Sequence, residues 1–138
     1  INIFNKNELN LSYRTSNIPK GNIILSANFD CLYGDKDEII KKINYIKTRR
    51  EESQPIRSKT SGSTFKNPKD NFAAKLIEMA DCKGMSVGDV YVSEKHANFL
   101  INKNHATASQ IEELGKKIID KVFDKFNIRL EWEVKIIG

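Results

Sequence analysis

The 138-residue sequence has few of the residues that build metal centres and disulfide frameworks: two cysteines, two histidines and one tryptophan. Cys31 and Cys82 have no neighbours at zinc-ligand spacing, so we expect no metal site and two reduced thiols, as in cytoplasmic proteins. No apolar run approaches the roughly 18 residues that a membrane helix needs. No basic segment followed by an apolar core opens the chain, as it would in a secretory signal. We therefore expect neither a disulfide-rich secreted domain nor a membrane protein.

The composition is that of a globular protein, with 39% hydrophobic and 30% charged residues. The net charge of +5 is compatible with a nucleic-acid surface and equally with a site for an anionic small molecule such as a nucleotide diphosphate. Charge alone does not separate these two. Because the chain does not begin with Met and opens inside an apolar stretch, we expect a fragment of a longer protein.

Hydrophobic patterning predicts strands first and a helix next. Residues 2–32 contain alternating apolar positions and a compact apolar run at 23–29, which predict strands. Asp35 and Glu38 then have the spacing of a capping box. The helix that they would begin carries an apolar stripe at Ile39, Ile40, Ile43 and Ile46.

The second half predicts a mixture of short elements. Residues 51–70 are rich in Pro, Gly, Ser and Thr and predict a long ordered loop between two domains, of a kind that is often functional. A helix over 71–80, ended by a Gly84 cap, and strands at 90–92 and 99–101 should follow. Thr107 and Gln110 predict the start of a longer helix ending at residues 126–127. Alternation over 130–137 predicts a final strand. The apolar stripe predicted for the longer helix is Ile111, Leu114, Ile118, Val122 and Phe123.

Three segments are distinctive in their order and spacing: 12–16 (SYRTS), 61–68 (SGSTFKNP) and 130–138 (LEWEVKIIG). They resemble the tyrosine-arginine, glycine-serine and terminal glutamate motifs of the UDP-N-acetylenolpyruvoylglucosamine reductase family. Segments 73–78 (AAKLIE) and 92–102 (VSEKHANFLIN) are similar to the same family. The resemblance covers essentially the whole chain, and family members are considerably longer.

This resemblance implies an α+β fold in several parts. Residues 1–55 would be the C-terminal part of an FAD-binding domain. Residues 56–128 would be a small α/β substrate-binding domain, and residues 129–138 a terminal strand returning toward the flavin. Family members use NADPH and FAD to reduce UDP-N-acetylglucosamine enolpyruvate to UDP-N-acetylmuramate during cytoplasmic peptidoglycan precursor synthesis. An absent N-terminal FAD-binding half would then be the chain's partner.

The resemblance also implies the catalytic residues. Ser63 matches the proton donor, and Glu133 matches a second active-site acid. Arg14 matches the arginine that faces the substrate carboxylate, a group that a planar guanidinium can bind through two hydrogen bonds. Tyr13 would support Arg14. Strand alternation places Glu131 and Glu133 on the same face, so only the motif selects Glu133.

Ligand-contacting residues follow from the same comparison. Asn67 and Lys83 match positions that hold the diphosphate of the UDP sugar. His96 stands where some members carry Gln. Gly62 would permit close approach of the flavin because a glycine tolerates unusual backbone angles. Lys135 stands where some members carry Arg, so it keeps the charge but loses the bidentate geometry.

Two other functions are open on the sequence alone. The chain could be a non-catalytic module that binds the UDP sugar without redox chemistry. It could also be a basic nucleic-acid-binding domain, although it lacks an aromatic RNA-binding motif and a recognition-helix signature. We therefore expect neither a nucleic-acid nor a membrane partner.

Overall fold

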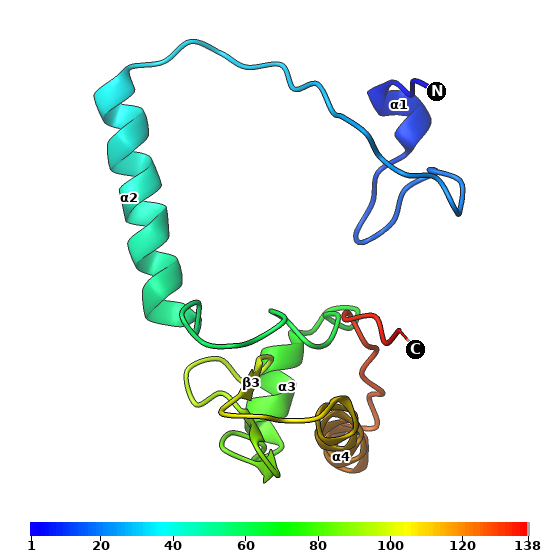
Figure 1. Cartoon of the computed structure of the whole chain (residues 1–138), viewed down its shortest axis with the longest axis vertical. Coiled ribbons are helices and arrows are strands. Elements are labelled where there is room, and N and C mark those ends of the chain that lie inside the picture. Colours follow the sequence, from blue (N-terminus) through cyan, green and yellow to red (C-terminus); the bar gives the residue numbers. More distant parts are fainter. Residues whose placement is uncertain (138) are drawn as a thin grey trace. The chain divides into compact units, whose positions relative to one another are not determined.

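The computed structural model describes residues 1–137, and the chain divides after Asp35 into two compact units. The first contains only one short helix, and the second contains the other helices and all the strands (Figure 1). The elements are α1 (Lys6–Leu9), α2 (Lys36–Ser53), α3 (Ala73–Met79), β1 (Ser86–Val87), β2 (Val90–Val92), β3 (Leu100–Asn102) and α4 (Ala108–Phe126). The α+β class is thus confirmed, whereas the functional division at residue 55 stays a prediction.

The first unit differs from its sequence prediction. The strands predicted over residues 2–32 do not form, and the described β-type contact in this unit is one bridge between Ser12 and Thr15. Instead, Asn5 begins α1 through a capping box with Glu8, whose carboxylate accepts the Asn5 N–H at 2.7 Å. Alternating apolar residues indicate the faces of a strand but supply no partner strand, and unpaired segments do not form a sheet.

Helix α2 confirms the helix predicted after Asp35. It continues to Ser53, so the following loop begins at residue 54 rather than 51. The isoleucines of its apolar stripe stay between 44% and 48% exposed. None of the helices among residues 1–137 is both long and apolar enough to cross a membrane.

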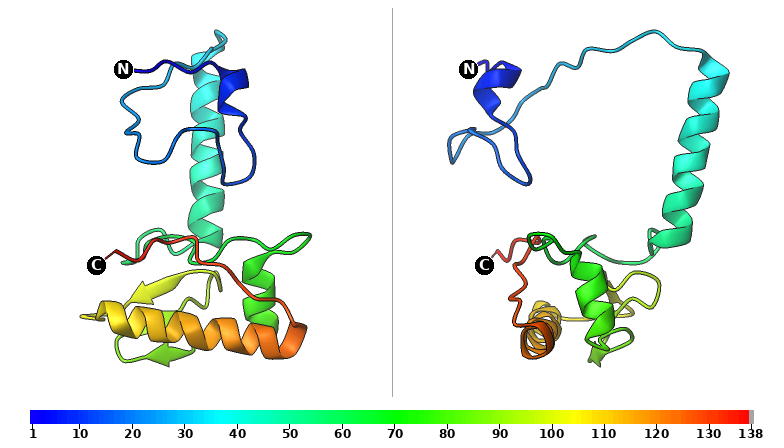
Figure 2. Two further views of the ribbon diagram at one scale, coloured as in Figure 1. Left: turned by 90° about the vertical axis from the view of Figure 1, so that its right-hand side faces the viewer. Right: turned by 180° about the vertical axis from the view of Figure 1, so that it is seen from behind.

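A three-stranded antiparallel sheet in the order β1-β2-β3 organises the second unit. Tyr91 of β2 pairs with Ser86 on one side and with Ile101 on the other. Helix α4 packs against β1, β2 and α3 (Figure 2). Strands 90–92 and 99–101 are thereby confirmed, the latter shifted by one residue. The centre of the core consists of Phe65, Ile77, Val90, Val92, Leu114, Ile118 and Val122.

Helix α4 begins and ends as its sequence predicts. Thr107 accepts the N–H of Gln110 through its hydroxyl at 3.3 Å, and the Gln110 side chain accepts the Thr107 N–H at 3.0 Å. Asn127 ends the helix in the left-handed conformation with φ of 54°. Phe123 departs from the predicted buried stripe because its side chain is 41% exposed.

Two further predictions are wrong in detail. The left-handed residue after α3 is Asp81, with φ of 55°, because Gly84 belongs to the next turn, where its N–H donates to the carbonyl of Val92. The strand predicted over 130–137 is reduced to one bridge between Phe65 and Trp132. Gly138, the last residue of the matched terminal motif, lies outside the described residues.

Candidate active site

The loop that carries Ser63 lies against the turn that precedes β3. Ser63 forms an antiparallel bridge with Phe99, and the Thr64 N–H donates to the carbonyl of Asn98 at 2.8 Å. Further along, the Asn102 N–H donates to the carbonyl of Lys59 at 2.9 Å. These contacts hold the loop predicted over residues 51–70 alongside β3 as an ordered segment.

The C-terminal segment lies along the other edge of the same loop. The Glu133 N–H donates to the carbonyl of Thr64 at 2.9 Å, and the Lys66 N–H donates to the carbonyl of Glu131 at 2.9 Å. Ring centroids of Phe65 and Trp132 lie 5.0 Å apart between these bonds. Ser63 and Glu133, which are far apart in sequence, are therefore carried by adjoining, hydrogen-bonded segments.

The structure separates Glu133 from Glu131. The Glu131 side chain is 75% exposed and pairs with Lys66 at 3.2 Å. Glu133 is half-buried, and its Oε2 atom is shielded from solvent. The two carboxylates thus have different environments, which an alternating strand pattern did not predict.

Two residues at this junction were missed by the sequence predictions. Thr64 is 1% exposed, and its Oγ1 atom has no hydrogen-bond partner among residues 1–137. Asn98 is 4% exposed, and its carboxamide bonds both the N–H and the carbonyl of Phe65. The signal for Asn98 was available, because it is a polar residue inside the apolar run 97–101.

His96 lies on the same turn as Asn98. Its Nδ1 accepts the Asn98 N–H at 3.3 Å, and its ring meets Phe99 edge-on with centroids 4.7 Å apart. Burial lowers the pKa of His96 and the positive charge of Lys83 lowers it further, against the opposing effect of a backbone hydrogen bond. Lys83 pairs with Glu78 at 2.7 Å. The structure therefore brings His96 into electrostatic range of Lys83.

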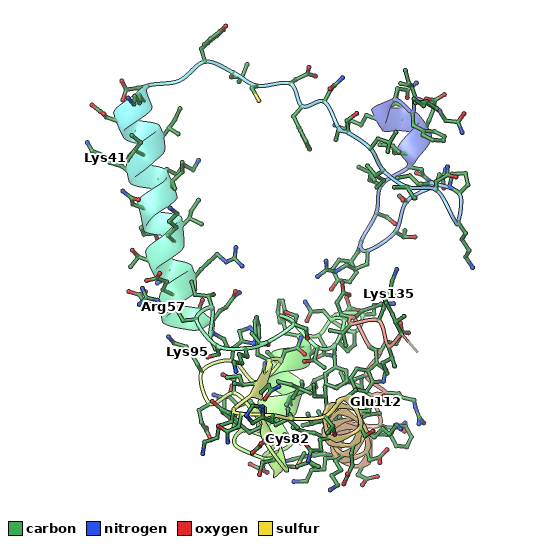
Figure 3. The ribbon with its side chains drawn as sticks, viewed as in Figure 1. Lys41, Arg57, Cys82, Lys95, Glu112 and Lys135 are labelled. Atoms are coloured by element: carbon green, nitrogen blue, oxygen red, sulfur yellow. The ribbon has the colours of Figure 1, made fainter. Side chains whose placement is uncertain are left out.

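Three other predicted site residues lie in the second unit and have only local contacts: Asn67, Gly62 and Lys135. Asn67 Oδ1 accepts the Ala73 N–H at 3.0 Å at the start of α3. Gly62 has φ of 89°, and a Cβ added there would meet no atom within 4 Å. Lys135 is exposed on the terminal segment (Figure 3). These residues lie on or near the Ser63 loop and the Glu133 segment, Gly62 immediately before Ser63.

Arg14 and Tyr13 belong to the first unit. Arg14 occupies the left-handed region with φ of 57° between the bridged residues Ser12 and Thr15. Its guanidinium carbon lies 5.6 Å from the centroid of the Tyr13 ring, within range of a cation–π contact. The support of Arg14 by Tyr13 at a substrate site stays a prediction.

A separate hollow lies where the end of α2 meets the turn after β2. Lys95 donates through Nζ to the carbonyl of Glu51, and Arg57 lines the same hollow (Figure 3). Arg57 pairs with Glu51 at 3.3 Å, and Glu94 also lines the hollow. The lining includes neither Ser63 nor Glu133. Within residues 1–137 there is also no cluster of three His, Cys, Asp or Glu side chains suited to a metal ion.

Comparisons with known proteins place the chain in a family. Residues 54–137 match the family model described as UDP-N-acetylenolpyruvoylglucosamine reductase, C-terminal domain. UDP-N-acetylenolpyruvoylglucosamine reductase from Wolbachia sp. subsp. Drosophila simulans is 42% identical over 98% of this chain and 46% of its own length. The Rhodopseudomonas palustris (strain BisB5) enzyme is 47% identical over 95% of the chain and 42% of its own length.

A solved structure is similar over the same extent. The crystal structure of UDP-N-acetylenolpyruvylglucosamine reductase from Thermus caldophilus matches with a TM-score of 0.77 and 34% identity, over 93% of this chain and 46% of that one. The chain spans less than half the length of each of these relatives. On its sequence, its fold and the arrangement of its motifs, the chain belongs to the UDP-N-acetylenolpyruvoylglucosamine reductase family.

Proposed function

We propose that this chain is the substrate-facing part of an enzyme that reduces UDP-N-acetylglucosamine enolpyruvate to UDP-N-acetylmuramate in cytoplasmic peptidoglycan precursor synthesis. NADPH is the electron source, and FAD, bound mainly by a separate N-terminal portion, supplies the hydride. Family membership supports the reaction class. The observation that carries the proposal is the hydrogen bond from Glu133 to the carbonyl of Thr64, because it joins the segments of the two proposed catalytic groups.

The reaction sets three tasks for side chains: holding the substrate carboxylate, stabilising the charge that develops toward it, and delivering a proton. Arg14 holds the carboxylate through its guanidinium. Ser63 gives its hydroxyl proton to the carbon next to the one that receives hydride. Glu133 is the second acidic group, and as a neutral carboxylic acid it would donate a hydrogen bond to the oxygen on which negative charge develops. A hydroxyl is a weak acid, so Ser63 must be well placed to act.

The flavin and the UDP sugar need different surfaces. Gly62 is compatible with the close approach of a flat ring, since it has no side chain and no atom of a non-neighbouring residue lies within 4 Å of where a Cβ would stand. Lys135 adds an exposed positive charge near that approach. Lys83 offers a point charge to the diphosphate, Asn67 its amide donors and His96 its free ring nitrogen. When the UDP sugar binds, Lys83 would leave Glu78 and pair with a phosphate group instead.

The test uses a full-length enzyme made by joining this chain to the N-terminal portion of a relative. Ser63→Ala should leave reduction of the flavin by NADPH unchanged and slow flavin reoxidation by the substrate roughly 10²- to 10⁴-fold, the range for a lost general acid. Ser61→Ala is the matched control, because Ser61 is an exposed neighbour in the same loop. Product formation at the normal rate by Ser63→Ala would exclude Ser63 as the acid.

The isolated 138-residue chain is expected to be colourless and inactive. If it is a UDP-sugar-binding module on its own, UDP should raise its melting temperature without any redox activity. NADPH turnover by the isolated chain would contradict the proposed division of the flavin site.

A further inference from the structure

The buried carboxamide of Asn98 binds the backbone of the Ser63 loop as a neighbouring strand would. Asn98 Oδ1 accepts the Phe65 N–H at 2.9 Å, and Asn98 Nδ2 donates to the Phe65 carbonyl at 2.8 Å. The backbone carbonyl of Asn98 also accepts the Thr64 N–H at 2.8 Å. One residue that is 4% exposed thus engages three backbone groups of the loop.

The opposite edge of the same short segment carries Glu133. The Thr64 carbonyl, which is not bonded to Asn98, accepts the Glu133 N–H at 2.9 Å. Thr64 and Phe65 therefore lie between Asn98 and the Glu133 segment. Any shift of the loop relative to Asn98 changes the positions of Ser63 and Glu133 together.

Before Ser63, the loop is anchored at Lys59, whose carbonyl accepts the Asn102 N–H at 2.9 Å. The Gly62 N–H donates to the Thr60 hydroxyl at 3.3 Å, a bond within the loop itself. Gly62 has φ of 89°, and Ser61 is exposed. The contacts nearest to Ser63 that join it to another segment are therefore its bridge to Phe99 and the bonds of Thr64 and Phe65 to Asn98.

We infer that Asn98 is a positioning residue for the proton transfer, holding the loop so that Ser63 and Glu133 keep their relative placement. This inference rests on the proposed function. Misplacing a reacting group by about 1 Å can cost roughly 10²-fold in rate. The carboxamide is suited to this role because it supplies a donor and an acceptor at once, which an aliphatic residue or a carboxylate does not.

Asn98→Asp tests the role with almost no change in size. The carboxylate still accepts the Phe65 N–H, but its second oxygen faces the Phe65 carbonyl and has no proton to donate. In the joined full-length enzyme at neutral pH, we expect NADPH to reduce the flavin at the wild-type rate. Reoxidation by substrate should slow by about 10²-fold. Asn98→Ala should show the same selective loss.

The pH profile distinguishes positioning from a general loss of stability. Burial raises the pKa of a carboxyl group, so lowering the pH should protonate the carboxylate introduced by Asn98→Asp and restore a donor to Phe65. The reoxidation rate of this variant relative to wild type should then rise as pH falls, and that of Asn98→Ala should not. Thr107→Ala, which weakens the remote cap of α4, is the stability control and should leave both half-reactions unchanged.

A second readout needs no flavin. In the 138-residue chain, Asn98→Ala should speed hydrogen exchange at the Phe65 and Glu133 amides by at least about tenfold, because the buried acceptor of the Phe65 N–H is lost and the loop is released. The amide of Ile118 in α4 should exchange at its original rate. If Asn98→Asp slows both half-reactions equally, or slows neither of them, Asn98 is not a positioning residue. If Ser63→Ala also lacks a selective defect, the proposed function itself fails.

Discussion

The N–H of Glu133 donates to the carbonyl of Thr64 at 2.9 Å, and Thr64 directly follows Ser63. Together with the bond from the Lys66 N–H to the Glu131 carbonyl, it connects two segments that lie far apart in the sequence of the second unit. The neighbourhood also distinguishes Glu133 from Glu131, whose side chain is at the surface with Lys66. The candidate site is therefore a junction between a loop and a terminal segment.

Glu133→Gln is expected to reduce turnover of the joined enzyme by roughly 10²-fold or more while FAD stays bound. Glu131→Gln is the matched control, since it makes the same carboxyl-to-amide change in a surface ion pair worth at most about 1 kcal/mol. Steady-state kinetics measure the turnover of both variants, and their flavin absorbance shows whether FAD stays bound. Equal turnover by the two variants would remove Glu133 from the mechanism.

Thr64→Val is expected to stabilise the chain. The hydroxyl is buried without a partner among the described residues, and an unsatisfied buried polar group costs about 1–3 kcal/mol. Thr107→Val should have the opposite effect of about 1 kcal/mol, because the Thr107 hydroxyl accepts the Gln110 N–H. Urea unfolding measures both changes. A loss of stability in Thr64→Val would show that its hydroxyl is hydrogen-bonded in solution.

Asn67→Asp should separate two roles of one side chain. The aspartate still accepts the Ala73 N–H at the start of α3, where a negative charge is favourable, so the melting temperature should hold or rise. Its charge should repel the diphosphate and weaken UDP binding by at least about tenfold. Calorimetric titration of the joined enzyme checks this, with Asn71→Asp as a control of equal charge. Unchanged UDP affinity would rule out a phosphate contact for Asn67.

Gly115→Ala is expected to destabilise the chain, although alanine normally favours a helix over glycine by about 1 kcal/mol. A Cβ at residue 115 would collide with the Trp132 ring, including atoms 2.7 and 2.8 Å away. Overpacking of this kind costs about 1–3 kcal/mol. Adding Trp132→Phe should recover most of the loss because the colliding ring atoms are absent from phenylalanine. Circular dichroism during urea unfolding measures each variant, and a stabilising Gly115→Ala would contradict the packing.

The pKa of His96 should make stability depend on pH. Burial, with Lys83 nearby, holds this pKa below its ordinary value of 6.5, so the unfolded chain binds the proton more tightly. The contribution of neutral, buried His96 to the free energy of unfolding is complete above the pKa that His96 has in the unfolded chain. It is lost as the pH falls through the lower pKa that His96 has in the folded chain. His96→Gln should remove this dependence, and His105→Gln should retain it, in urea unfolding from about pH 5 to 8. An NMR titration should also show a higher His96 pKa in Lys83→Met.

Local signals were predicted well from the sequence because their causes are local. The helix over 108–126 follows from the capping residues Thr107 and Gln110 and from its apolar stripe. Strand predictions over 2–32 and 130–137 failed for the opposite reason. A strand depends on a partner that periodicity does not name, and in those segments the described chain offers only single bridges.

The sequence by itself determined the family motifs, the long helices and the identity of the candidate groups Ser63, Glu133 and Arg14. Only the tertiary structure decided that Glu133, and not Glu131, is shielded beside the Ser63 loop. It also decided that Asn98 holds that loop from the other side. The physical reason is that these relationships are hydrogen bonds between distant segments, and they exist only once the core has packed those segments together.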